Sequence, residues 1–309
     1  SMVWAREDVA LGKRKDFLLA IMIGYEFLAE DSFSLGRWHD ALRYAALERE
    51  LAERTGAQSR VAWSHFSRGH AHYGLGDLPA ARQALAEALT LAETAGELRL
   101  AVIAGGSLSS VVADLDLDDE AEHLARESLA RAEELGQVYM LCMGRHALGY
   151  LHTRRGEWAA AGELYRECLA LNAGTDNQVN RLSIGAVVGE AYLGSGLVDE
   201  AAAFMEDYLA LVAAAGARHH EAWGLRVQGQ VLAARGAWEE ALHTLDQAVA
   251  RLEALGSRLE WGRALYHRAL LHRDRDRPEA AARDLERALD LFQACGARRD
   301  ARLAAGDSS

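Results

Sequence analysis

RGAWEEALHTLDQAVARLEALG, at residues 235–256, contains landmarks that recur along the chain at an interval of 40 residues. An alanine recurs without a break at positions 41, 81, 121, 161, 201, 241 and 281. A turn residue precedes it by five positions: Gly36, Gly76, Asp116, Gly156, Gly196, Gly236 and Asp276. A closing glycine also recurs, at positions 56, 96, 136, 216, 256 and 296, with Asp176 as the substitute. Seven units without an insertion predict one elongated domain in which each unit contacts its neighbours.

Each unit has the pattern of two helices. In the second unit we expect helices at 61–75 and 78–95, with Gly76 and Asp77 forming the turn between them. Apolar residues of the second helix share one face, at positions 81, 85, 88, 89 and 92. The chain is 50% hydrophobic with only two prolines, and strong helix formers dominate it. The recurring alanine predicts close packing of helices, since a larger side chain would push them apart. The sequence therefore predicts an all-α fold.

The segments GLGDLPAARQALAEAL, RRGEWAAAGELYRECLAL, GSGLVDEAAAFMEDYLAL and ARGAWEEALHTLDQAVARL resemble tetratricopeptide repeats. The usual period is 34 residues, and the aromatic residue of the usual second helix is mostly replaced here. A period of 40 also occurs in HEAT repeats, but the Gly-x-Trp turns at Trp38, Trp158 and Trp238 favour the tetratricopeptide family. The resemblance implies a right-handed superhelix of about seven helix-turn-helix repeats at 17–296. Residues 1–16 would form a partial capping helix, and 297–309 a short cap and tail.

The long repeat also resembles the helical arm of MalT-like bacterial signal-transduction ATPase regulators. The segment LFQACGARRDARLA at 291–304 is similar to the ends of such arms. Neither the phosphate-binding loop nor the DNA-binding module of those regulators occurs in this sequence. The resemblance therefore implies an arm without its ATPase.

Charge and composition exclude several partners. A net charge of −12 disfavours direct binding to nucleic acid, because phosphate backbones attract basic surfaces. The apolar run after Lys15 is shorter than a membrane span, so we expect no membrane partner. Cys142, Cys168 and Cys295 lie far apart in sequence and form no metal or redox motif, which favours a reducing, cytoplasmic location.

No catalytic or metal-binding motif stands out. His65, His70 and His72 lack a ligand spacing on one helix face, and His219 with His220 is an equally weak signal. The acidic run 114–120 lacks the central glycine and final glutamate of a calcium loop. Phosphate loops and nucleophile elbows are also missing. We therefore expect no metal, no cofactor and no enzymatic activity.

In tetratricopeptide arrays the first helix of each unit lines a concave groove, and the resemblance implies which residues face it. In this sequence they are Trp63, Phe66, His70, Tyr73, Met143, His146, Tyr150, Arg154, Glu190, Trp223, Arg226, Gln230, Arg263 and Tyr266. Packing between neighbouring first helices is an equally good explanation for any single aromatic residue among them.

Trp223, Arg226 and Gln230 are the most informative members of this set. A buried stripe of this helix is already supplied by Ala222, Leu225, Gly229 and Leu232. The neighbouring stripe, which holds Trp223, Arg226 and Gln230, is therefore expected to remain available to a ligand. Tryptophan and arginine together suit recognition of a partner. We therefore expect a non-catalytic module that binds a peptide, a protein partner or a small polar ligand, as the sensor or interaction arm of a bacterial regulatory protein. A free-standing peptide-binding adaptor and a helical accessory domain of an enzyme remain the alternatives.

Two units depart from the pattern. Gly105 and Gly106, followed by Ser107, Ser109 and Ser110, form a poor helix interior, which predicts a bend or soft point. Residues 172–177 form a polar connector without the usual glycine.

Overall fold

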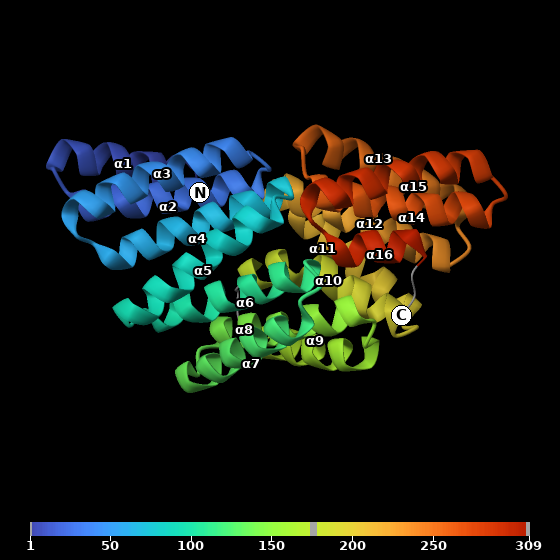
Figure 1. Cartoon of the computed structure of the whole chain (residues 1–309), viewed down its shortest axis with the longest axis horizontal. Helices are drawn as coiled ribbons and strands as arrows, with labels where there is room; N and C mark the ends of the chain where they lie inside the picture. The colour runs from blue at the N-terminus through green and yellow to red at the C-terminus, as the bar shows by residue number, and fades with distance from the viewer. Residues whose placement is uncertain (1, 174–177, 307–309) are drawn as a thin grey trace.

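The computed structural model describes residues 2–173 and 178–306, which form sixteen α-helices and no strand. The first pairs are α1 Met2–Lys15, α2 Leu18–Ser34, α3 Trp38–Thr55, α4 Gln58–Leu75, α5 Leu78–Ala95, α6 Leu98–Asp114, α7 Asp118–Leu135 and α8 Val138–Arg155. The others are α9 Trp158–Asn172, α10 Gln178–Gly194, α11 Val198–Ala215, α12 Arg218–Ala234, α13 Trp238–Leu255, α14 Arg258–Asp274, α15 Pro278–Cys295 and α16 Arg298–Ala305. The all-α prediction is confirmed, and the helices form a right-handed tetratricopeptide-like superhelix (Figure 1).

The recurring turn and closing residues end helices through a left-handed backbone. Gly256 ends α13 with φ 66°, and its N–H donates to the carbonyls of the last helical turn. Asp116 and Asp276 adopt φ values of 65° and 55° at the two turn positions that lack glycine. Aspartate tolerates this region better than most residues. Of the connector predicted at 172–177 and the cap and tail predicted at 297–309, residues 174–177 and 307–309 lie outside the described residues.

The recurring alanine lies at the contact between two helices. Six of the seven alanines are at most 1% exposed, whereas Ala281 in the last unit is half-buried. Glycines of the first helices serve the same purpose from the other side. A Cβ on Gly229 would lie 2.6 Å from Leu245 Cγ, so α12 and α13 approach more closely than any side chain at 229 would allow.

Helix α6 is continuous from Leu98 to Asp114, across the two glycines. Gly106 faces α8 closely, because a Cβ there would lie 3.4 Å from Ala147 Cβ and 3.3 Å from Ser128 Oγ. Gly106 is therefore explained by packing between neighbouring units, while the softness of this helix stays a prediction.

The superhelix closes on itself. Helices α2, α4 and α6 contact α12, α14 and α16 respectively, so the first three units meet the last two and the terminal helix (Figure 1). Trp38 Nε1 donates to the Leu255 carbonyl at 2.6 Å, and Arg258 Nε donates to the Leu75 carbonyl at 2.7 Å.

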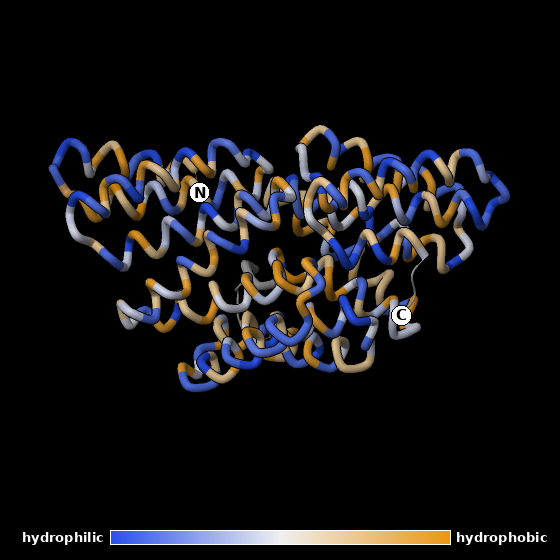
Figure 2. The backbone as a smooth tube through the Cα atoms, in the orientation of Figure 1, coloured by the Kyte–Doolittle hydropathy of each residue, from blue (hydrophilic) through white to orange (hydrophobic). Residues whose placement is uncertain are grey.

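Apolar and polar residues alternate along the helices (Figure 2), and no described helix is both long and apolar enough to cross a membrane. The core contains all three cysteines as free thiols. Cys142 and Cys168, distant in sequence, are packed together: each Sγ lies 3.6 Å from the carbonyl oxygen of the other. Pairing of α8 with α9 brings them together, which their separation in sequence did not indicate.

A matched pair of glycine substitutions tests close helix packing. Gly229→Ala should lower the free energy of unfolding by about 1–3 kcal/mol, because its methyl group overlaps Leu245. Gly105→Ala should raise it by up to about 1 kcal/mol, since the nearest atoms lie 3.8 Å from the new Cβ and alanine favours the helix. Urea unfolding measures both. A neutral Gly229→Ala would contradict the packing described here.

Candidate ligand-binding site

A cavity of about 170 Å³ lies on the axis of the closed superhelix. Its walls come from the first helices of six units and from α5. They comprise Phe33, Phe66, His70, Tyr73, Leu85, Ile103, Gly106, Ser107, Ser110, Val111, Tyr139, Met143, His146, Tyr150, Ser183, His219, His220 and Trp223. The walls are mainly aromatic and aliphatic, and no Asp, Glu, Lys or Arg is among the described residues that line them.

One end of the cavity is formed where the two ends of the superhelix meet. The ring of Phe33 on α2 packs edge-on against His219 of α12, with ring centres 5.5 Å apart. The centre of the Phe33 ring also lies 5.4 Å from that of His70 on α4. Trp38 packs at right angles against His219 at 5.0 Å. This end exists only because α2 and α12 are in contact.

Burial keeps the cavity histidines neutral. It lowers the pKa of His70, His146 and His219 to about 4 each. It lowers the pKa of His220 to about 3, with additional repulsion from His219 and His70. At pH 7 the cavity walls therefore carry no formal charge.

Three polar atoms at this end have no partner. Nδ1 of His219, Nδ1 of His220 and Nε1 of Trp223 are buried and make no hydrogen bond with any described residue. The three side chains are 2%, 8% and 8% exposed. Some other polar groups of the wall are paired, as His70 Nε2 is with Ser107 Oγ at 3.0 Å and His146 Nδ1 with the Tyr165 hydroxyl at 3.2 Å. A buried donor without a partner costs about 1–3 kcal/mol, so these atoms favour a ligand that satisfies them.

A buried network of charges lies beside the cavity. Arg263 on α14 contacts Asp114 of α6 at 2.6 Å, Asp300 of α16 at 2.9 Å and Glu260 at 2.7 Å. Arg154 contacts the same two aspartates, at 3.1 Å and 2.7 Å. The hydroxyls of Tyr73 and Tyr150 donate to Asp114 at 3.2 Å and 2.9 Å, which connects the network to the cavity wall.

The arginines keep the buried acids ionised. Burial alone would raise the pKa of Asp300, but Arg154 and Arg263 outweigh it, so the pKa lies well below the ordinary value. Burial alone would also raise the pKa of Glu260, but Arg226 and Arg263 outweigh it and lower that pKa below the ordinary value. Both acids are thus paired with buried arginines, and these guanidinium groups are already occupied.

The structure brings half of the predicted site residues together around the cavity: Phe66, His70, Tyr73, Met143, His146, Tyr150 and Trp223. Four others belong to the charge network: Arg154, Glu190, Arg226 and Arg263. Trp63 packs edge-on against Phe66 outside the cavity, Gln230 donates to the Arg226 carbonyl, and Tyr266 packs against His267. Whether these residues bind a ligand stays a prediction.

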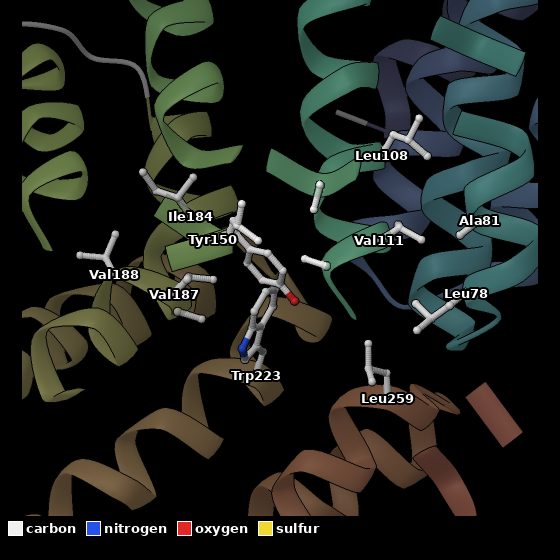
Figure 3. Packing of buried hydrophobic residues seen from close by; sticks show 14 of the residues in the cluster. Leu78, Ala81, Leu108, Val111, Tyr150, Ile184, Val187, Val188, Trp223 and Leu259 are labelled. Carbon is white, nitrogen blue, oxygen red and sulfur yellow. The ribbon is translucent and has the colours of Figure 1, made fainter. Parts of the chain in front are cut away.

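The expectation that Trp223 and Arg226 lie beside the buried core is wrong. Trp223 is 8% exposed and belongs to the same buried cluster as Tyr150 (Figure 3). Arg226 is 1% exposed and pairs with Glu190 and Glu260, so its guanidinium is already occupied. The neighbouring first helices α10 and α14 therefore cover the stripe that α12 alone would leave open at Arg226.

The 40-residue register could have revealed several residues that were missed. Ile103 and Ser183 occupy the position of Trp63 in the third and fifth units, and Gly106 occupies that of Phe66. Phe33 occupies the position of Tyr73 in the first unit. Tyr139 and His219 share one register position at the beginning of α8 and α12, and His220 follows it; the resemblance did not imply this position. Within residues 2–173 and 178–306 no group of His, Cys, Asp and Glu could hold a metal ion.

Comparison with known proteins reveals similarity of structure. No protein-family model and no curated protein sequence matches the chain. A Rap protein complexed with competence and sporulation factor has a TM-score of 0.74 at 16% identity, over 96% of this chain and 86% of the other. The Rap conjugation gene regulator of plasmid pLS20, in complex with the Phr* peptide, gives 0.73 at 14%, over 92% and 77%. NprR with its cognate peptide NprX gives 0.60 at 15%, over 88% and 82%. Identities this low show a shared fold.

Replacing one member of the buried network should destabilise the protein strongly. Arg263→Met leaves Asp114, Asp300 and Glu260 partly unpaired, so we expect a loss of about 3–5 kcal/mol in the free energy of unfolding. Arg82→Met removes an exposed ion pair with Glu120 and should cost less than about 1 kcal/mol. If urea unfolding shows that Arg263→Met and Arg82→Met lose similar amounts of unfolding free energy, the network does not hold the fold together.

The buried histidines should make stability depend on pH. Below pH 6.5 the unfolded chain protonates His220, while the folded protein keeps it neutral, so the free energy of unfolding falls. Between pH 7 and pH 5 this residue should account for about 1–2 kcal/mol of that fall. His220→Gln should remove this part of the pH dependence, whereas His243→Gln, at an exposed position, should not. Parallel pH profiles for the wild type and His220→Gln would contradict burial of a neutral imidazole.

Proposed function

We propose that this protein is a non-catalytic regulatory module whose ligand binds in the central cavity and controls closure of the superhelix. The observation that carries the proposal is the position of the cavity. Phe33 of α2 and His219 of α12 share its wall, although they belong to opposite ends of the repeat array. A ligand there contacts both ends at once.

Occupancy would act by stabilising the closed state. The direct contacts between the ends are few, and many of them are charged or polar. In the open state these groups and the cavity walls would be hydrated. A ligand that binds only the closed form shifts the population toward it in proportion to that difference in affinity. The position of the two end units relative to each other, and of their exposed outer surfaces, would then depend on whether the ligand is bound.

Similarity to the peptide complexes supports a regulatory role. The Rap and NprR structures contain competence and sporulation factor or a peptide, and they share this fold. For this chain we propose a peptide or a compact molecule as the ligand, in the cytoplasm. The protein would act as a sensor arm of a larger regulator of the MalT-like type or as a free-standing adaptor. Catalysis is disfavoured because the acids beside the cavity are tied up by arginines and its histidines are neutral.

Filling the cavity tests the proposal. Ser110 lines the cavity, whereas Thr90 is exposed on α5, so Ser110→Trp and Thr90→Trp add the same side chain inside and outside. The wild type and Thr90→Trp should retain a bound species from a cell-extract fraction below 1 kDa, detected by native mass spectrometry. Ser110→Trp should retain none.

Closure is measured on the same samples. Dyes on cysteines introduced at Arg43 of α3 and Glu239 of α13, both exposed, report the distance between the end units by energy transfer. Native cysteines are buried and should not react. The distance should shorten or become more uniform when the extract fraction binds. Retention of the same species by Ser110→Trp, or binding without any change in energy transfer, would overturn the proposed function.

A further inference from the structure

We propose that the cavity binds a compact, uncharged ring compound that carries a hydrogen-bond acceptor, rather than a charged molecule or several residues of a peptide. The proposal rests on the proposed function in one respect, namely that the central cavity is the ligand site. It differs from the sequence-based expectation of a small polar ligand. Volume, charge and the unpartnered polar atoms each support it.

The volume limits the size of the ligand. An engineered apolar cavity of about 150 Å³ holds one benzene molecule, and this cavity measures about 170 Å³. One ring with a short substituent therefore fits the closed form. A peptide of several residues would require the walls to move apart and would lose the contacts between α2 and α12.

The charge of the walls excludes ionised ligands. No Asp, Glu, Lys or Arg is among the described lining residues, and burial keeps the four histidines neutral. The nearest carboxylate behind the wall, Asp114, already accepts from Tyr73 and Tyr150 and pairs with Arg263. An ionised ligand would lose its hydration and find no free counter-charge.

The unpartnered atoms define the polar part of the ligand. Trp223 Nε1 is a donor only, so its partner must be an acceptor such as a carbonyl oxygen. His219 and His220 lie at the same end, with the rings of His219 and Trp223 centred 6.2 Å apart. Phe33, Phe66 and His70 form a contiguous group of rings that offers faces and edges to an aromatic ligand. The cavity thus provides apolar contact over most of a ring and a donor at one end.

Four single-ring probes test the ligand class: acetophenone, ethylbenzene, benzoate and benzylamine. They are similar in size and differ in acceptor and charge. By isothermal titration calorimetry at pH 7.5, acetophenone should bind the wild-type protein at least about five-fold more tightly than ethylbenzene, because only acetophenone satisfies the indole N–H. Benzoate and benzylamine should bind at least about ten-fold more weakly than acetophenone.

Variants connect the binding to the named atoms. Trp223→Phe keeps a ring but removes the donor, so it should bring acetophenone and ethylbenzene close to equal affinity without weakening ethylbenzene. Ser110→Trp should abolish binding of both, and Thr90→Trp should bind like the wild type. Circular dichroism melting of each variant shows whether it is folded at the titration temperature.

The outcomes separate the ligand class from the site. If benzoate or benzylamine binds as tightly as acetophenone and Ser110→Trp abolishes it, the cavity is the site and the class proposed here is wrong. Failure of all four probes to bind the wild type also overturns the class, while the extract experiment still decides the proposed function. If acetophenone binds Ser110→Trp as well as the wild type, it binds elsewhere, and both the class and the cavity site are refuted.

Discussion

The contact between Arg263 and the two aspartates Asp114 and Asp300 connects parts of the chain that no repeat interface joins. Asp114 ends α6 in the third unit, and Asp300 lies on α16 beyond the seventh. All three side chains are at most 5% exposed. Buried ion pairs of this kind add little net stability over apolar packing, but leaving one charge unpaired costs several kcal/mol. The network therefore favours one arrangement of the two ends over arrangements that leave its charges unpaired.

Further contacts between the ends extend this arrangement. Arg302 on α16 forms a bidentate pair with Asp116 at 2.6 Å and 2.9 Å, and Arg299 donates to the carbonyl of Ala113 at 3.0 Å. These groups surround the turn between α6 and α7, where Asp116 replaces the usual glycine. The same aspartate thus fits the left-handed turn and supplies a partner for the terminal helix. Asp116 therefore takes part both in the turn of its repeat and in the contact between the two ends of the superhelix.

Closure also determines the chemistry of the inner face. In an open array, the aromatic and histidine side chains of the first helices would line a hydrated groove. Contact between α2 and α12 turns one stretch of that groove into a cavity without formal charge, because burial lowers the pKa of its histidines. Polar atoms such as Trp223 Nε1 lose access to water at the same time. A site that is apolar, neutral and short of hydrogen-bond acceptors is the result.

The sequence by itself determined the helices and their pairing, since alanine, glycine and apolar spacing act between neighbours and repeat every 40 residues. The start of a helix was less well determined, since the helix expected at 61–75 begins at Gln58. Seven of the eighteen residues that line the cavity were also predicted, because residues such as Phe66, His146 and Tyr150 occupy inner-face positions of single units. The meeting of the two ends was decided only by the tertiary structure. Small twists between successive units add up over the whole array, and no local pattern reveals where α2 will meet α12 or α14 will meet α4. For that reason His219 with His220 lies at the end of the candidate site where α2 meets α12. Arg226 is paired inside the protein by its two neighbouring first helices, through Glu190 of α10 and Glu260 of α14.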